Sequence, residues 1–412
     1  MTRLSRIHPY PGMIADELAI QLSEEYVKPG DRILDPFCGT GRTLLAAAQR
    51  GAAAVGVDTN PLATLLVMAK ASVASVKVLR RLLEDMADGP IIESGGQIYN
   101  FEGGRKVRWF SIRAARELSA LIAFLNRQTL RSQELYILAT VLSATAREVS
   151  YCRNDQWKIH RISPAKRSAF KKSAWRVFLN RLRYVINELA ESEPLPASCR
   201  ALLGDSRNLS ALLCENGEKN PFDLIFSSPP YGDSRTTVQY GGVSTLCLGV
   251  VRHLNRLKLQ LRHDWSIDRS CLGGDLTSAS SVDQLTAKTL RRFWAGNNTN
   301  SAVKRIQAFL LDLSACCHQM IENLKLGGAA IFVVARRTVG GAQLKLDRFL
   351  VSIMESLGCV LDWVERREIS GKRTPFLVSI RGNSKRSLAD DSDYVPTMRY
   401  EYVLLFRKVR VR

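Results

Sequence analysis

The segment that most constrains the fold is a short apolar strand that leads through a glycine-bearing loop into a helix and a second apolar strand. Residues 32–35 read as the first strand, residues 37–41 as the loop, and residues 42–50 as a helix that Gly51 ends. Residues 53–58 follow as a buried strand. Elements in this order form a β-α-β unit, which predicts a parallel sheet covered by helices.

The remaining sequence extends this pattern and interrupts it twice. Apolar spacing predicts helices at residues 15–27, 62–86, 112–126, 134–147, 302–324 and 346–357, and strands at 222–226, 329–335, 360–366 and 400–407. We therefore expect an α/β fold with a doubly wound, Rossmann-like core, a mixed sheet and largely helical insertions. The expected core segments are 1–61, 199–232 and 300–412, and the expected insertions are 62–198, mainly helical and basic, and 233–299.

Charge and cysteine usage narrow the class of protein. The formal net charge of +20 suits a polyanionic partner, because Lys and Arg displace condensed counterions from phosphates. The nine cysteines form no C-x-x-C pair and the five histidines show no metal-ligand spacing, so we expect no metal site. Scattered cysteines, no apolar leader and no apolar run of about 18 residues predict a cytoplasmic protein with no membrane partner.

The glycine loop and the second strand predict a nucleoside cofactor. Gly39 and Gly41 let the backbone pass close to a ligand, and ligands of open α/β sheets lie beyond the carboxyl ends of the strands. Asp58 ends the second strand near the offset of about twenty residues at which a carboxylate binds a ribose. Leu44 stands where a dinucleotide fold has its third glycine, so a nucleoside without phosphates fits better than NAD or ATP.

A second loop, Ser228-Pro229-Pro230-Tyr231, follows the strand at residues 222–226. Two prolines fix φ near −65° and remove two N–H donors, so the loop presents carbonyl acceptors in a rigid arrangement. Such acceptors suit the N–H groups of an exocyclic amine. The tyrosine can stack on a base that has been flipped out of the duplex. Chemistry on a base requires this flipping, because the base stack blocks access to the reacting atom.

Together these segments resemble the amino-group DNA methyltransferases, which have a Rossmann-like fold and bind S-adenosylmethionine. The run from Asp35 to Gly41 looks like motif I, Asp58 with Asn60-Pro61 like motif II, and His8-Pro9-Tyr10-Pro11-Gly12 like motif X, while Asp205-Ser206 resembles the motif III strand end. The resemblance implies that Asp58 binds the ribose and that Asp205 lies near the adenine. The residues it assigns to the cofactor are His8, Pro9, Tyr10, Asp35, Pro36, Phe37, Gly39, Thr40, Gly41, Asp58, Asn60, Asp205 and Ser206.

The loop Ser228–Tyr231 matches motif IV of the cytosine-N4 enzymes, since the adenine-N6 enzymes usually show Asp or Asn in its first position. The resemblance implies direct methyl transfer to cytosine N4 at a specific site in double-stranded DNA, with the target base flipped out. Its catalytic residues are Ser228 and Pro229, whose hydroxyl and carbonyl hold the amine, with Pro230 and the stacking Tyr231. It also implies a restriction–modification system, with a cognate restriction endonuclease acting on the same site.

Three other functions stay open on the sequence: adenine-N6 methylation, RNA methylation of the tRNA guanine-N2 type, and nucleic-acid binding without catalysis. Two basic segments are candidates for DNA contact, residues 151–183 with Trp157 and Trp175, and residues 236–293 with several arginines. The first segment is equally compatible with a solvated helix face over core tryptophans.

Overall fold

The computed structural model describes most of the chain. The described residues are 4–90, 98–101, 109–153, 159–232, 239–257, 266–276, 284–293, 300–339, 342–369, 377–379, 394–396 and 398–410. The chain forms two compact units, each built from separate stretches of sequence. The first unit comprises Met1–Gly30, Cys38–Leu203 and Val238–Asp268, and the second comprises Asp31–Phe37, Gly204–Thr237 and Arg269–Arg412.

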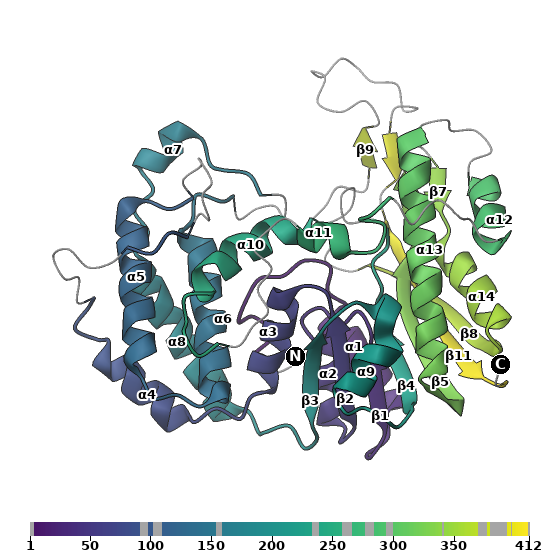
Figure 1. Cartoon of the computed structure of the whole chain (residues 1–412), viewed down its shortest axis with the longest axis horizontal. Helices are drawn as coiled ribbons and strands as arrows, with labels where there is room; N and C mark the ends of the chain where they lie inside the picture. Colours follow the sequence, from purple (N-terminus) through teal and green to yellow (C-terminus); the bar gives the residue numbers. More distant parts are fainter. Residues whose placement is uncertain are drawn as a thin grey trace. The chain divides into compact units, whose positions relative to one another are not determined.

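Helices and strands alternate along the core segments (Figure 1). The helices are α1 (Asp16–Tyr26), α2 (Arg42–Gln49), α3 (Pro61–Ala71), α4 (Val76–Asp85), α5 (Ile112–Arg127), α6 (Ser132–Val149), α7 (Pro164–Ser168), α8 (Ala174–Glu191), α9 (Leu209–Glu215), α10 (Tyr240–Val251), α11 (Ser266–Ser270), α12 (Gln284–Phe293), α13 (Asn300–Glu322) and α14 (Leu346–Ser356). The strands are β1 (Arg32–Asp35), β2 (Ala53–Asp58), β3 (Cys199–Leu203), β4 (Phe222–Ser227), β5 (Leu324–Ala335), β6 (Arg337–Val339), β7 (Ala342–Leu344), β8 (Cys359–Glu368), β9 (Leu377–Ser379), β10 (Tyr394–Pro396) and β11 (Tyr400–Lys408).

Seven strands share one sheet in the order β3-β2-β1-β4-β5-β11-β8. In the first unit β2 runs parallel to β3, and in the second β1, β4 and β5 run parallel to one another. The last strand, β11, is antiparallel to both β5 and β8. The predicted Rossmann-like α/β fold with a mixed sheet is therefore confirmed, including the final antiparallel strands.

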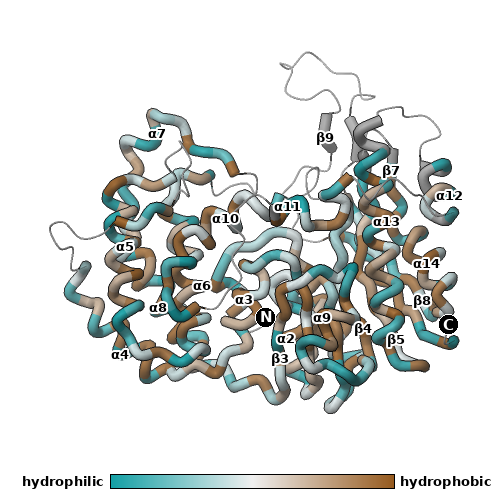
Figure 2. Tube along the Cα trace, viewed as in Figure 1, coloured by the Kyte–Doolittle hydropathy of each residue, from teal (hydrophilic) through white to brown (hydrophobic). Residues whose placement is uncertain are grey.

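The core of the first unit lies largely among helices. Figure 1 shows α4, α5, α6 and α8 grouped together, and Figure 2 shows hydrophobic residues recurring along these helices. Their buried apolar side chains belong to one hydrophobic cluster. Trp175 is 5% exposed in this cluster and donates its indole N–H to the Met86 carbonyl at 3.1 Å. This tryptophan therefore belongs to the core rather than to a nucleic-acid contact, whereas Trp157 lies outside the described residues.

One long helix predicted for residues 62–86 is wrong. The structure has two helices, α3 and α4, bent by 111° at the break between them. The apolar pattern continues across the break, but the Ser75 hydroxyl accepts a hydrogen bond from the Val78 N–H and starts a new helix. Ser72 follows α3 in extended conformation, so two serines carry the signal that hydrophobic spacing hides.

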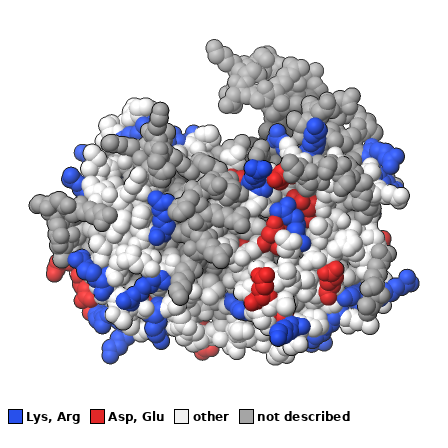
Figure 3. Space-filling model, in the orientation of Figure 1, with Lys and Arg blue, Asp and Glu red and all other residues white. Residues whose placement is uncertain are grey.

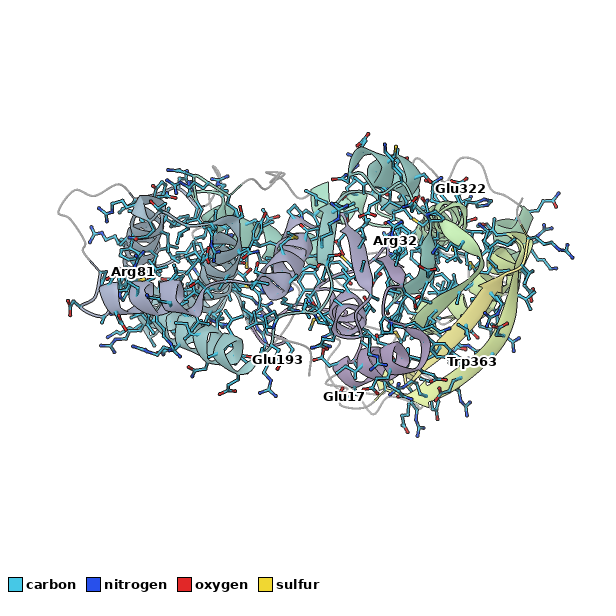
Figure 4. The ribbon with its side chains drawn as sticks, turned by 90° about the horizontal axis from the view of Figure 1, so that it is seen from below. Glu17, Arg32, Arg81, Glu193, Glu322 and Trp363 are labelled. Carbon is cyan, nitrogen blue, oxygen red and sulfur yellow. The ribbon has the colours of Figure 1, made fainter. Side chains whose placement is uncertain are left out.

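The second unit places α13 and α14 beside the strands β5, β8 and β11 (Figure 1). Its strand β5 begins at Leu324, before Gly327 and Gly328, so the predicted boundary at residue 329 was too late. Arg32, labelled in Figure 4, is the first residue of β1; it pairs with Glu218 and donates to the Asn220 carbonyl at 2.5 Å. The segment at residues 383–393, whose charged and serine-rich composition predicts a loop, lies outside the described residues.

Of the helices in the described ranges, none alone has the length and apolarity to cross a membrane; the bent pair α3 and α4 passes that test only when joined.

Candidate active site

Asp35 links the first and fourth strands at their carboxyl ends. Its Oδ1 accepts hydrogen bonds from the Ser227 hydroxyl at 2.5 Å and from the Phe37 N–H at 3.0 Å. Asp35 is 2% exposed and Ser227 is completely buried. The parallel pairing of β1 with β4 brings these strand ends side by side, so the segment Asp35-Pro36-Phe37 lies next to the start of the proline loop.

Ser206 joins the same group from the end of the β3 segment. Its hydroxyl donates to the Pro36 carbonyl at 2.5 Å, and its side chain is 4% exposed. Thus the segments resembling motifs I, III and IV meet within the second unit. Pro36 takes part through its carbonyl, which accepts the Ser206 hydrogen bond; a proline lacks the N–H but keeps this acceptor.

Asp205 is bound by its own neighbour. The Arg207 guanidinium donates to both Asp205 carboxylate oxygens, with distances of 2.6 to 3.0 Å, and also pairs with Asp312 of α13 at 3.0 Å. The hydrogen bond to Asp205 is the main reason that the pKa of Arg207 is raised. The side chain of Asp205 keeps 30% of its surface exposed, so the carboxylate is oriented but still accessible.

The Ser228 hydroxyl is fixed by two partners. It donates to the Val333 carbonyl of β5 at 3.0 Å and lies 3.2 Å from the Tyr231 hydroxyl. A serine hydroxyl has one hydrogen, so the hydrogen of this pair comes from Tyr231. Ser228 therefore faces Tyr231 and any nearby ligand as an acceptor. Burial raises the pKa of Tyr231 to about 12, and the bond to Ser228 only partly offsets this, so the phenol keeps its proton.

The glycine loop of the first unit is held by Asp58. Gly39 donates its N–H to Asp58 Oδ2 at 3.0 Å, and Asn60 donates its N–H to Oδ1 at 2.8 Å. These two bonds orient the Asp58 carboxylate. Gly39 has a φ of +50°, and a Cβ built there meets nothing within 4 Å.

Tyr10 and Asn60 meet in a buried network. Asn60 donates through Nδ2 to the Tyr10 hydroxyl at 3.0 Å and to the Ser244 hydroxyl of α10 at 2.9 Å. Its Oδ1 accepts the Leu62 N–H at 3.0 Å and caps α3. Tyr10 also stacks on Tyr240, with ring centroids 5.8 Å apart. Asn60 is 2% exposed, so it acts here as a junction between these segments.

His8 has both ring nitrogens engaged inside the first unit. Nδ1 donates to the Pro9 carbonyl at 2.7 Å, which leaves Nε2 to accept from the Ser143 hydroxyl at 3.0 Å. This pattern needs the neutral ring. Burial, aided by the charges of Arg147, Arg181 and Lys70, lowers the pKa of His8 to about 3 despite the Pro9 bond. His8 fixes the backbone of the expected motif X, and Pro9 follows it with its carbonyl in use.

Thr40 is anchored from two sides. Its hydroxyl contacts the Met13 sulfur at 3.1 Å, and its carbonyl accepts a hydrogen bond from Lys70 Nζ at 3.0 Å. Gly41, with a φ of +76°, lies so close to α3 that a Cβ there would be 2.8 Å from a Val67 methyl carbon. Helix α3 therefore supports the glycine loop directly.

These features fit a nucleoside cofactor. The open space beside Gly39 admits a ligand that a side chain would block, and Asp58 is an oriented acceptor for ribose hydroxyls. When bound, S-adenosylmethionine supplies the methyl group, and in the first unit Gly39, Thr40 and Asp58 would hold it. No group of three or more potential metal ligands occurs among the described residues.

Several residues of this site escaped the sequence reasoning. Ser227, Val333, Arg207 and Lys70 all hold a predicted site residue in place. The signal for Lys70 was its i+3 spacing from Val67 on an otherwise apolar helix, a position that faces the core. Val333 acts through its backbone, so no side-chain pattern reveals it.

Comparison with known proteins places this geometry in a family context. Residues 5–66 match the N6_N4_Mtase family, described as DNA methylase. The chain is 26% identical over 400 residues to the type II methyltransferase M.MvaI of Kocuria varians, which covers 90% of this chain and 85% of that protein. It is 21% identical over 406 residues to the type II methyltransferase M.BsoBI of Geobacillus stearothermophilus, covering 85% and 77%.

Two further matches are narrower or weaker. A stretch of 52 residues, 12% of this chain and 16% of its relative, is 50% identical to a tRNA (guanine(10)-N2)-dimethyltransferase of Methanothermobacter thermautotrophicus. The structure of the rRNA methyltransferase AviRa from Streptomyces viridochromogenes aligns over 98% of this chain and 89% of that one, with 12% identity and a TM-score of 0.32, too low to bear on the fold. The matches to the DNA methylase family and to the two type II enzymes confirm the resemblance found in the sequence and support an S-adenosylmethionine-dependent methyltransferase that acts on amino groups of DNA.

Proposed function

We propose that the chain methylates the N4 amine of cytosine at a specific site in double-stranded DNA, as the modification enzyme of a restriction–modification system. The observation that carries this proposal is the hydrogen bonding of Ser228. Because its hydrogen is donated to the Val333 carbonyl, its oxygen presents lone pairs toward Tyr231 and a ligand. An acceptor in the first position of the proline loop suits a base amine, which is a donor.

In this proposal Ser228 and the Pro229 carbonyl bind the two amine hydrogens, Pro230 keeps the loop rigid and Tyr231 stacks on the flipped base. The protein acts mainly by positioning, since two bound groups are held in line and shielded from water. The neutral phenol of Tyr231 supports this arrangement, because an ionised ring would reverse the donor role toward Ser228.

Within the helical insertion, the segment from residue 151 to residue 176 is the part that we assign to the DNA backbone. The segment from residue 151 to residue 176 exposes Arg153, Lys166, Lys171 and Arg176, and its described part contains no acidic residue. Arg167 lies over the Tyr151 ring at 5.9 Å and ties α7 to the preceding turn. Figure 3 shows Lys and Arg spread over this helical part with few Asp or Glu among them. Such a surface suits phosphate contacts.

Methylation of adenine N6 in DNA is the nearest alternative, because the N6_N4_Mtase family name covers both amines. The serine in the first loop position favours cytosine in our proposal. The 52-residue match to a tRNA methyltransferase keeps RNA as a further substrate to test. A cognate restriction endonuclease is part of the proposal and rests on the type II relatives.

The deciding experiment is expression in a host without DNA methylation, followed by sequencing that detects modified bases. We expect N4-methylcytosine at one recognition sequence; N6-methyladenine would replace the proposed base, and an unmodified genome would contradict DNA methylation. Labelled cofactor with DNA and tRNA in parallel separates the RNA alternative. Ser228→Ala and Tyr231→Ala should abolish transfer while S-adenosylmethionine affinity stays within about threefold, and full activity in both variants would refute the site.

A further inference from the structure

Lys70 is a buried lysine that contacts the cofactor loop. It lies in the last turn of α3 and is 1% exposed, a rare position for a lysine. Its Nζ donates to the Thr40 carbonyl at 3.0 Å. Burying an ammonium is costly unless its hydrogen bonds and charge are compensated, so this position needs an explanation beyond solubility.

Charged and titratable groups from three elements surround Lys70. Arg42 of α2 and Asp16 of α1 form an ion pair at 3.1 Å, and Cys199 belongs to β3. The negative charge of Asp16 is thus shared with a cation. Burial is the largest cause that lowers the pKa of Lys70 to about 7, Arg42 lowers it further, and Asp16 with Cys199 offsets part of the effect. The charge at this position therefore changes within the physiological range.

The contact of Lys70 is well placed to define the loop. Thr40 stands between Gly39 and Gly41, which both have positive φ, so its carbonyl direction sets the path of the turn. Val67, one helical turn before Lys70, packs against Gly41. The two residues share one face of α3 and hold neighbouring points of the loop, while Asp58 holds Gly39 from β2.

We propose that Lys70 is a positioning residue that fixes the Thr40 carbonyl from behind the loop and makes the affinity for S-adenosylmethionine depend on the charge at this buried position. S-adenosylmethionine carries a net positive charge through its sulfonium, whereas S-adenosylhomocysteine lacks the sulfonium. A charged Lys70 repels the first ligand more than the second. Affinity for S-adenosylmethionine therefore rises as the pH rises through about 7, and the affinity for S-adenosylhomocysteine rises less.

Calorimetry with both ligands between pH 6 and pH 8 tests this proposal on the intact chain without DNA. For the wild type, the ratio of the affinity for S-adenosylmethionine to that for S-adenosylhomocysteine should be roughly three- to tenfold higher at pH 8 than at pH 6. Lys70→Met should lose this step in the ratio of the two affinities, and it should bind S-adenosylhomocysteine at least about threefold more weakly because Thr40 loses its donor. Lys77→Met, an exposed change on α4, should match the wild type.

Lys70→Arg keeps a charge at every pH in this range and gives an independent test if Lys70→Met does not fold. At pH 8, the ratio of its affinities for S-adenosylmethionine and S-adenosylhomocysteine should equal the ratio that the wild type shows at pH 6. A pH step in Lys70→Arg like that of the wild type would overturn the proposal, as would a Lys70→Met protein with unchanged affinities. Both readouts use ligand binding alone, so they do not depend on which nucleic acid is methylated.

Discussion

The Ser227 hydroxyl donates a hydrogen bond to the Asp35 carboxylate at 2.5 Å, between the carboxyl ends of β4 and β1. Both side chains are buried, so each satisfies a group that water does not reach. Ser227 directly precedes the proline loop, and Asp35 begins the run that resembles motif I. The bond therefore couples the position of the proline loop to that of the segment Asp35-Pro36-Phe37 within the second unit.

Ser227→Ala should lower the free energy of unfolding by about 1–3 kcal/mol, because a buried carboxylate oxygen loses a donor. Urea denaturation measures this loss. Ser168→Ala, an exposed serine of α7, serves as the control and should change stability by less than about 0.5 kcal/mol. Equal stability of the two variants would show that the Ser227 bond contributes nothing.

The sequence predicted the strand ends that carry the site better than the contacts that hold it. The strands ending at Asp35, Asp58 and Ser227 were found within one residue, because apolar runs followed by glycine or proline loops mark them directly. The role of Asn60 was harder to foresee. A side chain next to a ribose-binding aspartate is expected to face the cofactor, yet tertiary packing turned it toward Tyr10 and Ser244.

Lys70 and the break between α3 and α4 escaped for a related reason. The apolar neighbours of Lys70 on α3 indicate a buried position, but only the packing of α3 against the loop reveals its contact with the Thr40 carbonyl. The serines at 72 and 75 are ordinary polar residues in sequence, and they become helix ends once α4 turns away to join the helical core. Long-range packing determines both features, and hydrophobic periodicity alone does not encode such packing.

The glycines of the loop offer a matched pair of substitutions. Gly41→Ala should destabilise the protein by about 2–4 kcal/mol, because a φ of +76° disfavours alanine and its Cβ would lie 2.8 Å from a Val67 methyl carbon. Gly39→Ala should cost only the backbone term of about 1–2 kcal/mol, since its Cβ meets no atom within 4 Å.

The open space at Gly39 adds a second expectation for that pair. Gly39→Ala should weaken S-adenosylmethionine binding by at least about tenfold, because the added methyl group fills space that we assign to the cofactor. Urea denaturation and calorimetry measure the two effects separately. Wild-type affinity in Gly39→Ala would show that the cofactor does not bind beside this loop.

Adding Val67→Ala to Gly41→Ala should restore part of the lost stability, because it removes the methyl groups that the new Cβ meets.

The buried neutral His8 should make the free energy of unfolding decrease in acid. Its pKa is about 3 in the folded protein and about 6.5 when the chain unfolds, so between these values the unfolded state binds more protons. Stability from this group is complete above pH 6.5 and declines as the pH falls toward 3. From pH 6.5 to pH 4.5 the loss approaches about 2–3 kcal/mol for one proton.

His8→Gln should remove that part of the acid dependence, because an amide offers a donor for Pro9 and an acceptor for Ser143 without titrating. The measurement is the urea midpoint of each protein at pH 4.5 and pH 7.5. His160→Gln, at an exposed histidine, should keep the wild-type dependence. An equal loss in acid for His8→Gln and the wild type would show that His8 does not stay neutral in the fold.

The salt dependence of DNA binding tests the assignment of residues 151–176 to the DNA backbone. Each phosphate contact contributes a slope of about −0.9 in log affinity against log salt, so removing cations that contact the DNA backbone makes the slope less steep.

The test variant changes four exposed residues of one segment to Gln: Arg153, Lys166, Lys171 and Arg176. Its control changes the same number of exposed charges on α4 and α5: Lys77, Arg80, Arg81 and Arg116. We expect the slope of the test variant to be less steep by about 2–4, with cofactor affinity unchanged, and that of the control to stay near the wild type. Because both variants lose the same net charge, a general electrostatic effect would flatten both lines equally, and that result would place the DNA contact elsewhere on the protein.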